Sequence, residues 1–202
     1  VKKDTENTMS FNLTVGQYQL LNEIDEELSM IEQNIYAVAA IRGITYEEAS
    51  KIKMTEFSKI VSGLTDFNVR LLEKVRISNK IRLGEIDYHI EHKPDKLTSG
   101  QLLDVLNIRS KNQGKAVEVM DMLLASMCKP KGKEYGDDDL NINERAALIR
   151  DVKLSEVWNV FVFFWNLWNN YFNDSEDSLS KWMEETPKKV QQILDEDGDY
   201  SA

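Results

Sequence analysis

The chain has 202 residues and a net charge of −10, because 25 lysines and arginines are outnumbered by 35 aspartates and glutamates. The length fits one large or two small domains, and a hydrophobic fraction of 42% excludes a mostly disordered chain. The acidic balance disfavours binding to nucleic acid or to anionic membrane, because both need a basic surface. We therefore expect protein partners. The single cysteine, Cys128, excludes an intramolecular disulfide and a multi-cysteine zinc site.

The ends of the chain carry few apolar residues. We expect a flexible N-terminal arm over residues 1–12, where no apolar segment is typical of a signal peptide. No stretch reaches the roughly 18 uninterrupted apolar residues of a membrane span, so we expect no membrane association. An acidic, disordered tail is expected over residues 195–202.

A helix-start phrase occurs twice in the chain, as LTVGQ at 13–17 and as LTSGQ at 97–101. Both fit a capping box, in which the threonine oxygen accepts from the third N–H of the helix and the glutamine reaches back to the cap. A related start, ITYEE at 44–48, has glutamate in the reciprocal position. Well-made helix starts explain the repetition better than an internal duplication does.

Residues 13–78 are predicted to form an N-terminal helical subdomain. Apolar residues recur every three or four positions from Tyr18 to Ile41, with a bend or break near 25–27, and Gly43 follows where a C-terminal cap is expected. A short helix over 46–53 and one or two further helices extend to about residue 78.

Residues 79–93 change to the alternating pattern of a β-hairpin, with strands within about 80–91 and a tight turn at Gly84-Glu85. A lone hairpin is marginally stable in water. This one must therefore pack on the helices or pair with another chain.

Residues 94–194 are predicted to form a C-terminal helical subdomain. Helices are expected from Thr98, over 116–127, from Asn141 or Asn143 to Arg150, from about Ser155, and over 178–194. The segment 129–132 is interpreted as the end of the second of these helices. The fold class is thus mainly α: a multi-helix domain with one small β-hairpin and a long aromatic C-terminal helix.

The aromatic helix beginning near Ser155 is the most apolar segment of the chain, and its asparagines form one narrow polar stripe. Such a helix either lies at the centre of the core or packs on a partner. As an interface it supplies aromatic anchors of the kind that dominate binding energies. Together with the hairpin it gives these candidate interface residues: Ile86, Tyr88, Ile90, Trp158, Phe161, Trp165, Trp168 and Tyr171.

No catalytic constellation is present in the sequence. His89 and His92 are the only histidines, and positions three apart on one strand point to opposite faces, so we interpret them as surface residues. The acidic runs at 137–139 and 195–199 lack the later ligands of a calcium loop. Phosphate-binding glycine motifs are absent, and Gly16 and Gly100 stand alone. We therefore predict no enzymatic activity, no cofactor and no metal.

Several phrases together resemble a family of small proteins from the structural-gene blocks of tailed bacteriophages, including the crAss-like phages. They are LTVGQYQLLNEID at 13–25, GITYEEA at 43–49, LGEIDYHI at 83–90, LTSGQLLDVL at 97–106 and LLASMCKPKGKEY at 123–135, followed by the aromatic helix. The order is also similar to that of some tail assembly chaperone-like proteins. The resemblance covers roughly residues 11–172.

The resemblance implies a virion protein that packs by protein–protein contacts in the portal, neck or tail, as a homo-oligomeric ring or connector component assembled in the host bacterial cytoplasm. The resemblance gives no catalytic residues to transfer to this chain. One alternative is a soluble tail assembly chaperone that is not retained in the particle. Another is an enzyme with an unrecognised site, with His89 and His92 as its candidate residues.

Overall fold

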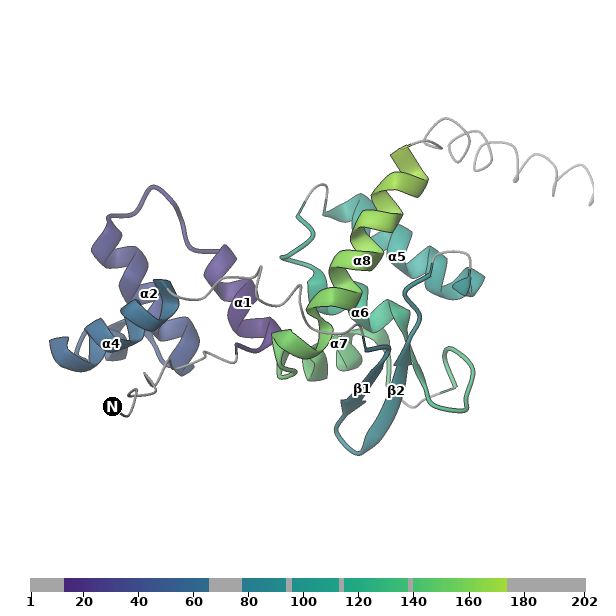
Figure 1. Ribbon diagram of the computed structural model, residues 1–202, viewed down its shortest axis with the longest axis horizontal. Helices are drawn as coiled ribbons and strands as arrows, with labels where there is room; N and C mark the ends of the chain where they lie inside the picture. The colour runs from purple at the N-terminus through teal and green to yellow at the C-terminus, as the bar shows by residue number, and fades with distance from the viewer. Residues whose placement is uncertain (1–12, 66–77, 94–95, 113–114, 138–139, 174–202) are drawn as a thin grey trace, which may run out of the picture. The chain divides into compact units, whose positions relative to one another are not determined.

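The computed structural model describes residues 13–65, 78–93, 96–112, 115–137 and 140–173, and this part of the chain is mainly helical with one small antiparallel sheet (Figure 1). The predicted mainly α class with a small β-hairpin is confirmed. The predicted arm over 1–12, the helix over 178–194 and the tail over 195–202 lie outside the described residues. The elements in chain order are α1 Val15–Asn22, α2 Met30–Arg42, α3 Tyr46–Ala49, α4 Met54–Thr65, β1 Lys80–Leu83, β2 Ile86–Ile90, α5 Ser99–Lys111, α6 Met120–Met127, β3 Cys128–Pro130, α7 Ile142–Arg150 and α8 Leu154–Asn173.

Internal contacts divide the chain into two compact units, Val1–Phe163 and Phe164–Ala202. The predicted subdomain boundaries at 78/79 and 93/94 both lie inside the first unit. No helix of the described segments combines the length and the hydrophobicity needed to cross a membrane.

The three predicted capping boxes are confirmed, whereas the helix expected over 116–127 begins only at Met120. Thr14, Thr45 and Thr98 each accept from the third N–H of the helix that follows, and the third side chain accepts in return from the cap N–H. Asn141 makes the same capping box ahead of α7. The predicted break near 25–27 is also present, since α1 ends at Asn22 and α2 begins at Met30.

The glutamines of the repeated phrase do more than cap. Gln17 Oε1 accepts from the N–H of Thr14 at 2.9 Å, while its Nε2 donates to the carbonyl of Ile41 at 2.8 Å. Gln101 Oε1 accepts from the N–H of Thr98 at 3.1 Å, and its Nε2 donates to the carbonyl of Met127, also at 3.1 Å. A carboxylate has no N–H to donate, so these two positions need an amide.

Gly16 of the same phrase lets α1 approach the end of α7. A Cβ at Gly16 would lie 3.1 Å from the Cβ of Arg150 and 3.2 Å from its carbonyl oxygen, closer than packed atoms normally come. Helix α1 is further fixed by Val15 N–H, which donates to Val152 O at 2.9 Å, and by Leu13 O, which accepts from Leu154 N–H at 2.7 Å.

Gln19 ties α1 to the segment before α6. Its buried Nε2 donates to the carbonyls of Val117 and Glu118 at 3.2 and 3.0 Å and to Asp121 Oδ1 at 2.9 Å. Helix α1 therefore packs with α6 and α7.

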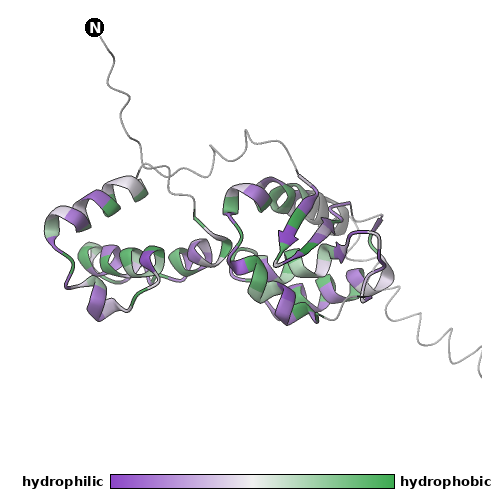
Figure 2. Ribbon diagram, turned by 90° about the horizontal axis from the view of Figure 1, so that it is seen from below, coloured by the Kyte–Doolittle hydropathy of each residue, from purple (hydrophilic) through white to green (hydrophobic). Residues whose placement is uncertain are grey.

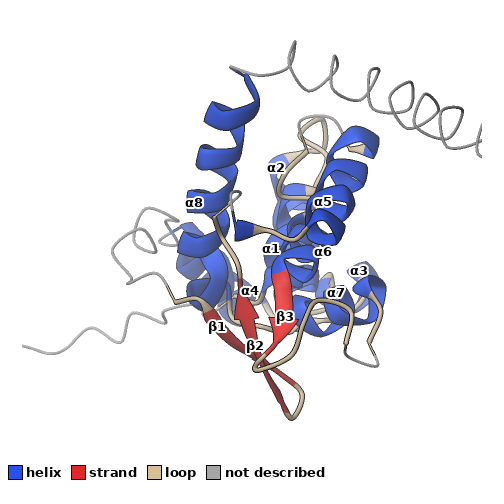
Figure 3. Ribbon diagram, turned by 90° about the vertical axis from the view of Figure 1, so that its right-hand side faces the viewer, coloured by secondary structure: helices blue, strands red, loops and turns tan. Residues whose placement is uncertain are grey.

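The hairpin forms with the predicted turn. Leu83 lies opposite Ile86, and Gly84 has a φ of 59°, in the left-handed region that suits glycine. The sequence interpretation of 129–132 as the end of a helix misses β3, Cys128–Pro130. This short strand pairs with β2, so β2 is the central strand of three (Figure 3).

Apolar residues along the helices and strands form the core, and hydrophobic and hydrophilic residues alternate along the helices (Figure 2). In the N-terminal helices one cluster contains Val38, Ala39, Ala49, Phe57 and Ile60. Elsewhere in the first unit the largest fully buried side chains are Tyr88, Ile90, Met120, Leu123, Leu124, Met127, Ile149 and Leu154.

A polar cluster joins α5, the loop before α7, and α7. The hydroxyl of Tyr135 donates to Asp104 Oδ2, and the guanidinium of buried Arg145 lies 5.1 Å from the centre of the Tyr135 ring. Burial raises the pKa of Tyr135 above its ordinary value of 10.0, and the hydrogen bond to the Asp104 carboxylate raises it further.

Replacing Gln101 by glutamate keeps the cap but turns a buried carboxylate toward the carbonyl of Met127. We expect the free energy of unfolding in urea at pH 7 to fall by about 1–3 kcal/mol. The matched control is Glu48→Gln in the exposed capping box of α3, which should change it by less than about 0.5 kcal/mol. Equal effects of the two substitutions would contradict the assigned role of Gln101.

The Tyr135 cluster predicts a loss of stability in alkaline solution. Because the folded pKa of Tyr135 is raised, its stabilising contribution is complete below pH 10.0 and is lost as the pH rises toward the folded value. We expect Tyr135→Phe to reduce the slope of unfolding free energy against pH above 10. Urea unfolding of both proteins over that range is the measurement, and identical slopes would refute the expectation.

Candidate functional site

The hairpin residues predicted to form an interface differ in their exposure to solvent. Tyr88 and Ile90 are buried on the core side of β2, where the folded chain leaves them no surface for a partner. Ile86, directly after the turn, is 44% exposed. A neighbouring chain cannot add to β2, because β1 and β3 already occupy both of its edges.

The first turns of the aromatic helix lie in the core of the chain. Trp158 and Phe161 are buried, and the ring of Tyr18 packs edge-on against Trp158 with centroids 5.4 Å apart. Trp165 is half-buried. The side chains of Trp168 and Tyr171 lie outside the described residues, so an interface there stays a prediction.

The two histidines do not share a site. His89 projects from the solvent side of β2, and its Nε2 lies 3.7 Å from Glu91 Oε2. The ring of His92 instead packs edge-on against Phe163, with centroids 5.4 Å apart. No group of three metal-ligating side chains is found among the described residues.

The solvent face of the sheet carries a cluster of basic side chains that the sequence analysis did not single out. Lys80, His89 and Lys129 lie directly opposite one another across β1, β2 and β3. Arg82 lies opposite Asp87 in the next row, and the N–H of Lys131 donates to the carbonyl of Asp87 at 2.9 Å. We call Lys80, Arg82, His89, Lys129 and Lys131 the basic sheet face.

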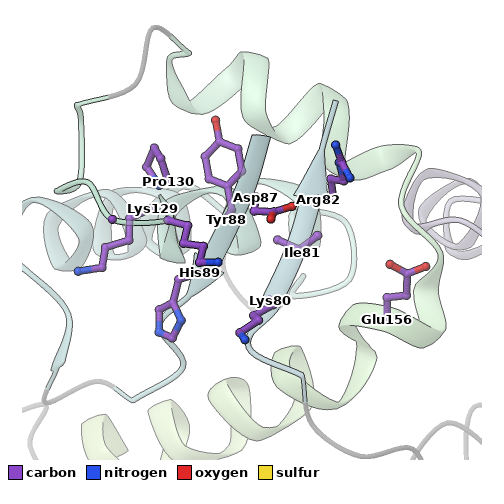
Figure 4. Close-up of a pocket in the computed structure, with 11 residues that line it drawn as sticks. Lys80, Ile81, Arg82, Asp87, Tyr88, His89, Lys129, Pro130 and Glu156 are labelled. Atoms are coloured by element: carbon purple, nitrogen blue, oxygen red, sulfur yellow. The ribbon is translucent and has the colours of Figure 1, made fainter. Parts of the chain in front are cut away.

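This face is hollowed, with a volume of about 630 Å³. Figure 4 shows Lys80 and His89 at one end of the hollow and Arg82 with Asp87 at the other. Glu156 of α8 also lines it, and Lys129 is 3.9 Å from the exposed Glu134. Lys80, Arg82 and Lys131 form no ion pair with any carboxylate of the described segments.

The hollow is lined by more cationic than anionic side chains. Lys80, Arg82, Lys129 and Lys131 line it, together with the two acids Asp87 and Glu156. Complementary charges attract across a binding surface. The geometry therefore suits a group that carries several negative charges.

A second surface, which we call the apolar groove, lies in the N-terminal helices. Its volume is about 620 Å³, and its apolar lining comes from Leu20, Ile24, Leu28, Tyr36, Ala39, Ala40, Ile44 and Tyr46. Leu20 is 40% exposed, and Tyr36 stacks at a tilt on Tyr46 with centroids 4.6 Å apart. Met30, the first residue of α2, is 80% exposed.

The loop between α1 and α2 forms the acidic turn, defined here as Glu23, Asp25, Glu26 and Glu27. All four residues are exposed, and none forms an ion pair with a described lysine or arginine. Asp25 Oδ1 accepts from the N–H of Glu27 at 2.9 Å. Gln33 Nε2 donates to the carbonyls of Glu26 and Leu28 at 3.1 and 2.8 Å, so the turn has a fixed conformation.

For the acidic turn, the sequence analysis predicted only a bend or break of the helix near 25–27. The alternation of Lys80 and Arg82 with buried residues was available as a signal for one strand of the basic sheet face. The contribution of Lys129 depends on β3, whose pairing partner is about forty residues earlier in the chain and has no local sequence signature.

Comparison of the chain with protein-family models, with curated proteins and with solved structures found no match.

Proposed function

We propose that this chain is a non-enzymatic protein that acts through protein–protein contacts, as a homo-oligomeric structural component of a tailed-phage virion in the portal, neck or tail region. The observation that supports an interaction role is the apolar groove, which leaves several large apolar side chains in contact with water beside the acidic turn. The virion and its assembly in the host bacterial cytoplasm are supported by the sequence resemblance.

The groove has the properties of a docking surface for an apolar segment. Aromatic and aliphatic residues line it, and the charged residues Glu23 and Asp25 lie at its edge. Interfaces commonly have this arrangement of an apolar centre with a polar rim. An assembly chaperone that covers an apolar partner and then leaves would use the same groove, so retention in the particle separates the two candidate functions.

Mass spectrometry of purified virions tests the location. We expect peptides of this chain at a copy number consistent with a ring of subunits. Absence from purified particles, together with association with a tail component during assembly, would favour the chaperone. Absence from both would contradict the proposal.

Replacing Leu20 by glutamine tests the groove itself. Removing this apolar contact should reduce incorporation into particles by about fivefold or more, because burying a leucine contributes more than about 1 kcal/mol to an interface. The matched control is Leu103→Gln, a 58% exposed helical leucine outside the groove. Quantitative mass spectrometry of particles carrying each variant gives the comparison, and thermal unfolding verifies that both variants fold. Equal incorporation of the two would show that the groove is not the contact.

A further inference from the structure

We propose that the basic sheet face of one copy binds the acidic turn of a second copy, so that subunits associate head to tail. This inference rests on the proposed function, since it names two surfaces by which copies of the chain contact one another. It assigns the basic sheet face a ligand class, a compact group of carboxylates, and assigns the acidic turn a role beyond solubility.

The basic sheet face has the chemistry for such a ligand. Three cationic side chains, Lys80, Arg82 and Lys131, have no ionic partner among the described residues, and Lys129 has only a distant exposed one at 3.9 Å. They line a hollow of about 630 Å³, so a docked turn would be partly removed from water. Charge pairs gain strength when water is excluded around them.

The acidic turn matches this surface in charge, size and rigidity. It presents four carboxylates over five residues at the exposed end of a helix pair. The hydrogen bonds from Gln33 and to Asp25 already fix its backbone, so docking costs little conformational entropy. Asp87 and Glu156, the two acids that line the hollow, leave an excess of cationic side chains there.

A second copy is the occupant that the charge distribution favours. The chain has a net charge of −10, so two copies repel each other unless a local basic surface of one meets an acidic surface of the other. Both surfaces lie in the first compact unit. Because the two surfaces differ, the contact is heterologous, the type that generates rings when the rotation between subunits closes.

Charge reversal of both surfaces provides the test. The basic-face variant is Lys80→Glu with Lys129→Glu, and the acidic-turn variant is Glu26→Lys with Glu27→Lys. The control is Lys51→Glu with Lys59→Glu, exposed lysines outside both surfaces. It takes the net charge from −10 to −14, as the basic-face variant does, because each substitution changes the charge by −2. Sedimentation velocity over a concentration series measures self-association of the full chain.

We expect either surface variant alone to weaken self-association about tenfold. The control should weaken it less, and about 1 M salt should weaken the wild-type contact relative to about 50 mM. Mixing the two surface variants should restore association, because each then offers the charge that the other lacks. Circular dichroism verifies that all variants keep their helices.

Three outcomes would overturn the inference: a wild-type chain that stays monomeric at low salt, surface variants that behave like the control, or mixed variants that fail to associate. The second outcome would leave the proposed function standing, because the copies would then associate through other surfaces. The proposed function fails separately, when the chain is absent from virions and from assembly complexes.

Discussion

The position of α1 depends on backbone hydrogen bonds to segments far along the chain, and much of the first unit depends on α1. Leu13 and Val15 bond to the chain between Val152 and Leu154, and Gln19 bonds to the segment before α6. These contacts satisfy polar groups that would be costly to bury unpaired. They also hold the acidic turn and the apolar groove, which directly follow α1, on the same unit as the sheet.

The repeated phrase illustrates how far the sequence determines this architecture. Thr14 and Thr98 could be assigned as caps from residue types alone, because a capping box is a local structure over four residues. The hydrogen bonds that Gln17 and Gln101 donate through Nε2 could not be predicted. Their acceptors, the carbonyls of Ile41 and Met127, lie outside the four residues of each capping box. The choice of glutamine over glutamate was nevertheless visible in the sequence, and it is a usable signal for a tertiary contact.

The same division between local and distant information applies to the sheet and to the candidate site. The β1–β2 hairpin was predictable because its pattern and its turn are contiguous, whereas β3 is three residues long and pairs with a strand about forty residues earlier in the chain. Tyr88 and Ile90, two of the predicted interface residues, are buried on the core side of β2. The apolar groove was not predictable, because apolar helix residues have the same spacing whether a partner helix covers them or not.

The capping boxes also differ from one helix to another in how they respond to acid. Hydrogen bonds from Ser29 lower the pKa of Glu32, and those from Thr45 lower the pKa of Glu48. A group with a lowered folded pKa stabilises the protein above its ordinary value of 4.5 and loses that contribution as the pH falls through the folded value. Glutamine does not titrate, so the starts of α1 and α5 keep their reciprocal bonds. Protonation of Glu32 and Glu48 therefore weakens the caps of α2 and α3, two helices that line the apolar groove, while the glutamine cap of α1 on the same groove does not respond to acid.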